Sequence, residues 1–189
     1  FVVHRAVREP FNQRAASGLV DYLAQADVVA IEGVDTRALT RHLRTHGAMR
    51  GAISTVELNP ERLVARVRER PVMEGLALAG EVTSGGVEIY RQRRDQEPHV
   101  VLVDAGTKLG IARQLARRGA AVTLAPYDVD IETVLSLAPD GVLVSNGPGD
   151  PEPLDATIDL MRELMEHRIP LGGICLGHQL LGLAVGGER

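Results

Sequence analysis

The chain has 189 residues, 44% of them hydrophobic, 3% aromatic and 24% charged, with a formal net charge of −4. These values exclude wholesale disorder and argue against a surface for nucleic acid or anionic membranes. No apolar run approaches the roughly 18 residues of a membrane span, and a single cysteine excludes an internal disulfide. We expect a cytoplasmic protein with neither a nucleic acid nor a membrane as partner. The chain opens at Phe1 without a signal-peptide pattern and stops at Arg189 early in a predicted helix, as expected of a fragment truncated at both ends.

The first half of the chain is predicted to be a smaller mixed α/β domain. Ser17 and Asp35 are candidate helix caps, Gly47 is placed to end a helix, and Asn59 precedes a proline at the first helical position. The expected elements are helices over 18–26, 36–46 and 60–70 and strands over 28–31, 50–55 and 83–90.

A charged, proline-ended stretch at 91–98 resembles a linker, and it separates this half from a second one of different character. The second half alternates short apolar runs with helical patterns, which predicts parallel strands joined by right-handed crossovers. Continuous apolar strands indicate a sheet covered on both faces. We therefore expect an α/β domain with a doubly wound, mostly parallel sheet. Its predicted strands are 99–103, 121–124, 141–144 and 169–174, and its predicted helices are 111–118, 131–137, 156–167 and one from about 177.

The only cysteine lies in the pattern Gly173-Ile-Cys175-Leu-Gly177, between an apolar run and a predicted helix. G-x-C-x-G is the thiol counterpart of the G-x-S-x-G nucleophile elbow. A sharp strand-to-helix turn exposes the central side chain and brings the two flanking glycines close together. The cysteine then lies at a helix N-terminus, which favours a thiolate. The pattern indicates a nucleophile, and a buried, inert cysteine is the alternative.

Two more loops are predicted at the same sheet edge, where open α/β sheets bind their ligands. Residues 145–151 (SNGPGDP) place glycines on both sides of Pro148 and so expose backbone N–H groups. Such a loop can form half of an oxyanion hole or hold a small polar substrate. The alternative is a plain connection in which Asp150 or Asp155 caps the next helix. Residues 104–108 (DAGTK) form the third loop.

These motifs resemble a known family. SNGPGDP followed by GICLGHQLLGLA is similar to the class I (triad) glutamine amidotransferases. Residues 33–54 (GVDTRALTRHLRTHGAMRGAIS) resemble the N-terminal domain of carbamoyl-phosphate synthetase small subunits, as does Asp104-x-Gly-x-Lys108, although Gly110 replaces the family's usual asparagine. The resemblance implies that residues 1–92 belong to that N-terminal domain and residues 98–189 to the amidotransferase domain.

The resemblance also implies an activity and roles for particular residues. Cys175 would attack the carboxamide of L-glutamine and form a glutamyl thioester, with the oxyanion held by the backbone N–H groups of Gly147 and Leu176. Gly149 and Gln179 would help to seat the glutamine. Ammonia would pass to a large synthetase subunit, forming a heterodimer, and that partner uses ATP and bicarbonate to make carbamoyl phosphate for arginine and pyrimidine synthesis. No cofactor or metal is implied in this chain.

The family's triad also needs a His and a Glu on a later strand and loop, and Arg189 comes only 14 positions after Cys175. The leaving ammonia needs a proton donor, so this chain alone is expected to have little or no glutaminase activity. His178 is not expected to substitute, because helical side chains lean back toward the N-terminus.

Other polar residues have less specific interpretations. His42 and His46 have the i, i+4 spacing of metal ligands, but neighbouring arginines favour a solvated helix face. Lys108 is the only lysine, which suggests either a retained amine or a coding bias toward arginine. Two alternative functions stay open: an amidotransferase of another pathway, and a non-catalytic interaction subunit that keeps the fold.

Overall fold

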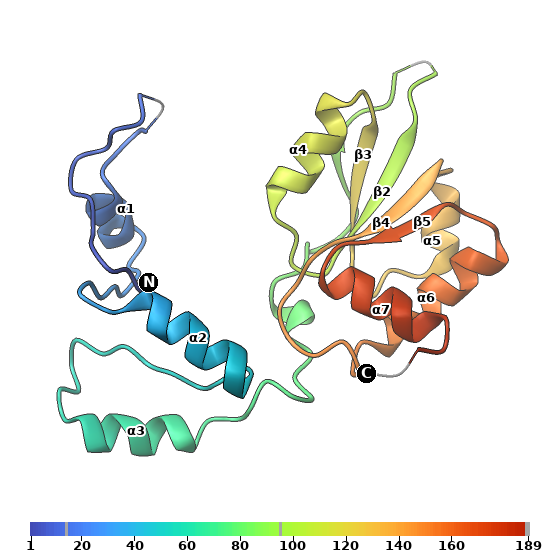
Figure 1. Ribbon diagram of the computed structural model, residues 1–189. Coiled ribbons are helices and arrows are strands. Elements are labelled where there is room, and N and C mark those ends of the chain that lie inside the picture. Colours follow the sequence, from blue (N-terminus) through green and yellow to red (C-terminus); the bar gives the residue numbers. More distant parts are fainter. Residues whose placement is uncertain (14, 95, 188–189) are drawn as a thin grey trace. The chain divides into compact units, whose positions relative to one another are not determined.

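The computed structural model describes residues 1–13, 15–94 and 96–187 (Figure 1). The chain forms two compact units, Phe1–Val72 and Met73–Arg189. This division falls upstream of the 92/98 boundary expected from the sequence. Strand β1 (Glu88–Arg91) pairs with a strand of the second unit, and Gly75 and Ser84 donate to the carboxylates of Asp150 and Asp104 in that unit, so the residues before β1 also belong to it.

A five-stranded sheet forms the centre of the second unit (Figure 1). Its order is β1-β3-β2-β4-β5, in which β1 pairs antiparallel with β3 and all other neighbours are parallel. The mostly parallel sheet expected from the sequence is thus confirmed. The remaining strands are β2 (His99–Asp104), β3 (Ala121–Pro126), β4 (Gly141–Val144) and β5 (Leu171–Gly173).

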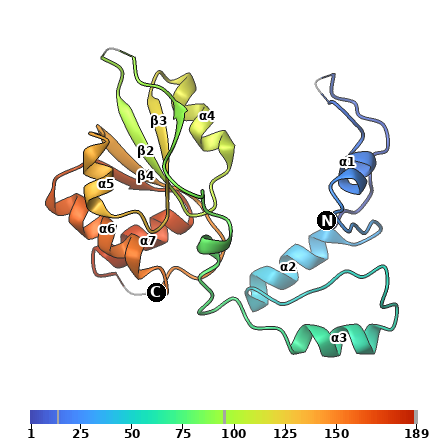
Figure 2. The ribbon, with the colours of Figure 1, turned by 180° about the vertical axis from the view of Figure 1, so that it is seen from behind.

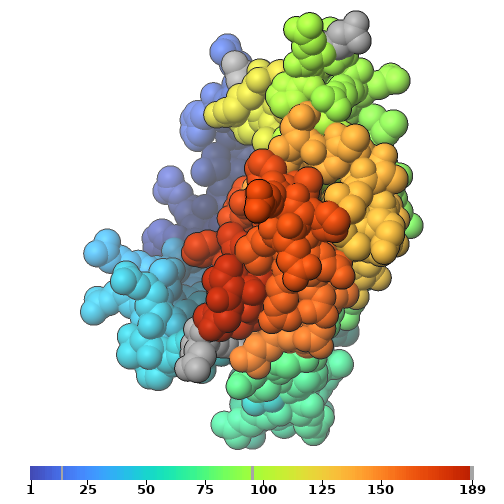
Figure 3. Space-filling view, turned by 90° about the vertical axis from the view of Figure 1, so that its right-hand side faces the viewer, coloured from blue at the N-terminus to red at the C-terminus, as the bar shows by residue number. Residues whose placement is uncertain are grey.

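Helices cover both faces of the sheet (Figure 2). Helix α4 (Leu109–Arg117) packs on one face, where Leu102, Val122 and Leu124 are buried. The other face buries the alternate strand residues, Val101 and Val103 among them, under the remaining helices. Those helices are α5 (Ile131–Ser136), α6 (Asp155–Glu166) and α7 (Leu176–Ala184). Helices α6 and α7 pack together, and their orange and red surfaces adjoin in Figure 3. No helix in the described part of the chain has the length and apolarity needed to cross a membrane.

The first unit contains the three predicted helices, α1 (Leu19–Gln25), α2 (Thr36–His46) and α3 (Pro60–Arg68). The side chain of Asp35 accepts from the N–H of Ala38, and that of Asn59 accepts from the N–H of Arg62, so these two predicted caps are confirmed. The expected cap at Ser17 is wrong, because the N-cap residue of α1 is Gly18, and no side chain caps that helix. The strands predicted at 28–31 and 50–55 do not form. Residues 28–31 contribute only an isolated bridge to Val2, and residues 50–55 form no ladder with any described segment.

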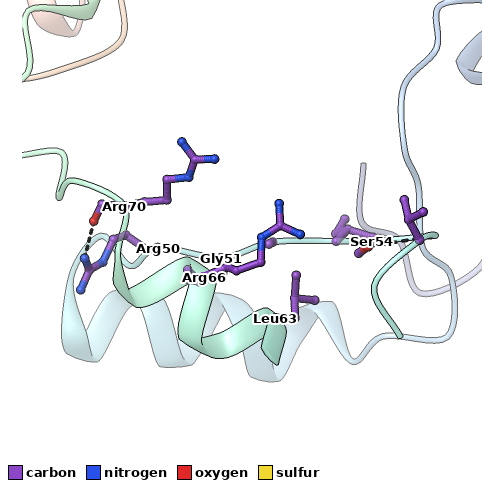
Figure 4. Close-up of a pocket in the computed structure, with 10 residues that line it drawn as sticks. Arg50, Gly51, Ser54, Leu63, Arg66 and Arg70 are labelled. Carbon is purple, nitrogen blue, oxygen red and sulfur yellow. Dashed lines mark hydrogen bonds between the residues drawn. The ribbon is translucent and has the colours of Figure 1, made fainter. Parts of the chain in front are cut away.

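A pocket of about 430 Å³ in the first unit lies between residues 50–56 and α3 (Figure 4). One guanidinium nitrogen of Arg50 donates to the carbonyl oxygen of Arg68 at 2.8 Å and also to that of Arg70. These carbonyls lie at and just beyond the end of α3, where helix C=O groups lack intrahelical partners. The Arg50 side chain therefore satisfies carbonyl groups at the C-terminal end of α3.

Two carboxyl groups of the second unit have lowered pKa values. The guanidinium of Arg91 donates to Glu97 at 2.6 Å and lowers the pKa of that carboxyl below its ordinary value. The carboxylate of Asp130 accepts from the N–H of Thr133 at 2.6 Å, and this hydrogen bond lowers the Asp130 pKa below 3.8. Asp130 is thereby the N-cap of α5.

Replacing Asp130 with Ala is expected to lower the melting temperature in a pH-dependent way. Because the folded-state pKa lies below the unfolded value of 3.8, the ionised cap stabilises fully above pH 3.8. The stabilisation is lost as the pH falls through the folded pKa. Melting curves of the parent protein and of Asp130→Ala, followed by circular dichroism from pH 7 downward, should therefore converge at acid pH. A gap that stays constant with pH would contradict this role of the carboxylate.

Candidate active site

The turn between β5 and α7 holds Cys175 in an unusual backbone conformation. Cys175 immediately precedes α7 with φ 54° and ψ −107°, a combination that L-residues rarely adopt. Its side chain is exposed. Conformations of this kind cost about 1–3 kcal/mol and cluster at functional sites, where the surrounding structure enforces them. The strand-to-helix elbow predicted from the sequence is confirmed.

The two glycines that flank the elbow are required by close backbone contacts. A Cβ atom on Gly173 would lie 2.2 Å from the carbonyl oxygen of Gly177, and one on Gly177 would lie 2.3 Å from that of Val144. The N–H of Gly177 also donates to the carbonyl of Ser145 at 3.1 Å. The two flanking glycines of the elbow are therefore in contact with each other, and the elbow is hydrogen-bonded to the residue that follows β4.

The glycine loop after β4 lies against both neighbouring loops. A Cβ on Gly147 would lie 2.0 Å from the carbonyl oxygen of Ala105 and 2.8 Å from a methyl group of Leu176. The buried hydroxyl of Ser145 accepts from the N–H of Ala105 at 3.0 Å and so joins the loop after β2 to the loop after β4. The structure thus brings Gly147 next to Leu176, the residue that follows Cys175.

The other predicted site residues lie apart from this contact. Gly149 has φ 94°, and a Cβ there would lie 2.5 Å from the carbonyl oxygen of Leu76. A close backbone approach to residue 76 therefore explains glycine at this position. Gln179 and His178 are exposed in the first turn of α7, where their N–H groups both donate to the carbonyl of Cys175 at 3.0 Å.

Two buried carboxylates at the edge of the sheet that holds the elbow were not predicted as site residues. Asp104 is 6% exposed, and Asp150 is 3% exposed. Asp150 accepts from the N–H of Gly75 at 2.8 Å and from that of Glu152 at 3.2 Å. It does not cap α6, whose N-cap residue is Leu154. The place of Asp104 directly after a predicted buried strand could have indicated this residue, but only the fold shows which backbone N–H groups donate to its carboxylate.

Metal-ligating side chains do not gather in the part of the chain that the structure describes: it contains no group of three His, Cys, Asp or Glu residues suited to hold an ion. His42 and His46 stack with ring centroids 4.2 Å apart on the exposed side of α2, and His46 contacts the carbonyl of His42. The backbone N–H of Lys108 donates to the side chain of Asn146 at 3.2 Å, and the Lys108 side chain is exposed.

Comparisons with known proteins match both halves of the chain. The family model for glutamine amidotransferase class-I matches residues 101–188, and the model for the carbamoyl-phosphate synthase small chain, CPSase domain, matches residues 1–53. Proteins named carbamoyl phosphate synthase small chain are 55% identical in Thermotoga maritima, 43% in Archaeoglobus fulgidus and 45% in Methanopyrus kandleri. All of this chain aligns with each of them. It covers 47%, 52% and 52% of their lengths, so the chain spans about half of the curated relatives that it matches.

A solved structure from Thermoplasma acidophilum, of a protein described as part of a GMP synthase, is less similar. It has 23% identity and a TM-score of 0.43 over 49% of this chain and 47% of that one. The cysteine elbow, the glycine loop beside it and the family match over 101–188 define the second half as a class I glutamine amidotransferase domain. The first half matches a domain model of a single family within that class. The chain belongs to the carbamoyl phosphate synthase small chain family.

Proposed function

We propose that the protein containing this chain hydrolyses glutamine at Cys175 and supplies the ammonia to a large synthetase subunit. The observation that carries the proposal is the elbow, where close backbone contacts hold Cys175 with an exposed side chain, and where Gly147 lies against Leu176, the next residue. A strained, exposed nucleophile near a glycine loop that can offer backbone N–H groups is the arrangement that acyl transfer requires. The names of the relatives support carbamoyl phosphate as the final product.

In the proposed reaction, the thiolate sulfur of Cys175 forms a bond to the carboxamide carbon of glutamine. The N–H groups of Gly147 and Leu176 then hold the negative oxygen of the tetrahedral intermediate. Collapse of that intermediate breaks the C–N bond, and the departing nitrogen takes a proton and leaves as ammonia. Water hydrolyses the resulting glutamyl thioester to glutamate and restores the thiol. Gly149 and Gln179 are proposed to contribute to the glutamine pocket.

The remaining parts of the proposal concern the whole protein. The family's His would act as base and proton donor, oriented by the Glu, and the residues after Cys175 in this chain contain no His-x-Glu pair. The large subunit would use ATP and bicarbonate, so that the heterodimer serves arginine and pyrimidine synthesis. Chemistry at a reduced thiol supports a cytoplasmic location, since cytosolic thiols are kept reduced.

The test is to treat the full-length protein with a chloroketone analogue of glutamine and to map the modified residue by mass spectrometry. Modification at Cys175 that excess glutamine prevents would support both the nucleophile and the substrate. The same treatment in the presence of excess glutamate is the control for substrate recognition. If Cys175 stays unmodified in the folded protein, the proposal is wrong, and a non-catalytic interaction subunit becomes the better interpretation.

A further inference from the structure

Residues 75–84, here called the strap, contact the loops that build the site. At one end, the N–H of Asp150 donates to the carbonyl of Leu76 at 3.0 Å, and Gly75 donates to the Asp150 carboxylate. In the middle, helix η1 (Leu78–Glu81) buries Ala79 in the core. At the other end, the hydroxyl of Thr83 donates to the carbonyl of Asp104 at 2.6 Å. The strap therefore joins the loop after β4 to the loop after β2.

Asp104 is the junction between the strap and the loop after β2. One carboxylate oxygen accepts from the N–H groups of Gly106 at 2.9 Å and Thr107 at 2.6 Å, which closes the turn. The other oxygen accepts from the N–H of Ser84 in the strap at 2.9 Å. A buried carboxylate that accepts three backbone N–H groups binds more strongly than a neutral acceptor in the same place. Asp104 thus holds two separate segments with one side chain.

The turn that Asp104 closes is the surface on which the glycine loop rests. Gly147 lies directly against the carbonyl of Ala105, and a Cβ on Gly106 would lie 2.8 Å from Pro148 and 2.9 Å from Val82 of the strap. The side-chain nitrogen of Asn146 donates to the carbonyl of Gly106 at 3.2 Å. Close packing of this kind transmits displacements, because there is no free space to absorb them.

We propose that Asp104 is a positioning residue for glutamine hydrolysis: by holding the turn 104–107 against the strap, it sets the position of the Gly147 N–H group. This inference rests on the proposed function, because it assumes that Gly147 stabilises an oxyanion. Asp104 is not proposed to touch glutamine. Its effect is confined to the step in which negative charge develops on the substrate oxygen, since only that step needs the N–H group in place.

The test is Asp104→Asn in the full-length protein. The amide oxygen can still accept from Gly106 and Thr107, but the amide NH₂ then faces the N–H of Ser84, donor against donor. Three quantities are measured: kcat for glutamine hydrolysis, KM for glutamine, and the rate at which iodoacetamide alkylates Cys175. Alkylation forms a sulfur–carbon bond and releases iodide without any oxyanion. We expect kcat to fall by about 10- to 100-fold, as for small displacements of catalytic groups, with KM and the alkylation rate unchanged.

Asp140→Asn is the matched control. Asp140 accepts the N–H of His99 at 2.7 Å at the opposite end of β2 and pairs with Arg93 at 3.0 Å, so this variant replaces a strand-end carboxylate far from the elbow. Its kcat is expected to equal that of the parent protein. Ser84→Ala is a second control within the strap, because the buried Ser84 hydroxyl has no hydrogen-bond partner among the described residues while its backbone N–H is retained.

A second variant covers the case in which Asp104→Asn does not fold. Thr83→Val removes the hydroxyl that joins the carbonyl of Asp104 to the N–H of Tyr127, and it leaves the shape of the side chain nearly unchanged. We expect the same selective loss in kcat, of smaller size. Parent-like kcat in both variants, or equal losses in kcat and alkylation rate, would overturn the inference alone. Absence of turnover in the parent protein would overturn the proposed function as well.

Discussion

Cys175→Ala is expected to reduce glutamine hydrolysis by the full-length protein by about 10⁴- to 10⁶-fold, the range seen when a covalent nucleophile is removed. Ammonia supplied directly should still be used by the complete synthetase, because the proposed chemistry of the partner does not involve the thiol. The measurement is glutamate release and, separately, product formation from glutamine and from ammonium salt. Turnover of glutamine close to that of the parent protein would place the nucleophile elsewhere.

The same position yields a stability comparison. Alanine at 175 keeps a Cβ in the φ 54° conformation, whereas glycine adopts it without steric cost. Cys175→Gly is therefore expected to be more stable than Cys175→Ala by about 1 kcal/mol, as judged by urea denaturation. A higher stability of Cys175→Gly than of Cys175→Ala would show that the elbow is held in place against local strain, and equal stabilities would contradict it.

Gly147→Ala is expected to have the second large effect. The added methyl group would lie 2.0 Å from the carbonyl oxygen of Ala105, so the loop must move. We expect kcat for glutamine to fall about 100-fold and the protein to lose about 1–3 kcal/mol of stability. Kinetics and urea denaturation of the full-length protein measure the two effects.

Gly110→Ala is the matched control for that substitution. Gly110 lies in the first turn of α4, and a Cβ built there has no neighbour within 4 Å. Alanine is the better helix former, so this variant should gain up to about 1 kcal/mol and keep its activity. Equal behaviour of the two variants would mean that the close contact at Gly147 has no functional consequence.

Local signals in the sequence were sufficient for much of the second unit. The apolar run at 141–144 coincides with β4, and Gly119 ends α4 with φ 90° as its place after the helical pattern suggested. The elbow could also be predicted, because its pattern occupies five consecutive residues, although Gly177 also contacts Val144 and Ser145. In each case the signal in the sequence is local.

The wrong predictions concern segments whose structure depends on residues far away in the chain. Residues 50–55 have the composition of a strand, but a strand needs a pairing partner, and no described segment pairs with them. The predicted strand over 83–90 is shortened to Glu88–Arg91, because residues 83 and 84 bind Asp104. The strap has no periodicity, and its partners lie 20 to 75 positions away in the chain. Nothing local in its sequence could reveal these contacts.

The exposed side chain of Cys175 has a consequence for oxidation. An accessible cysteine side chain can be oxidised to sulfenic acid, which a second thiol normally captures as a disulfide. These 189 residues contain no second cysteine, so capture within the chain cannot occur. Unless a small-molecule thiol captures the sulfenic acid first, further oxidation gives the sulfinic acid, which thiols do not reduce. Glutathione or a similar reductant in the buffer is therefore expected to preserve the Cys175 thiol.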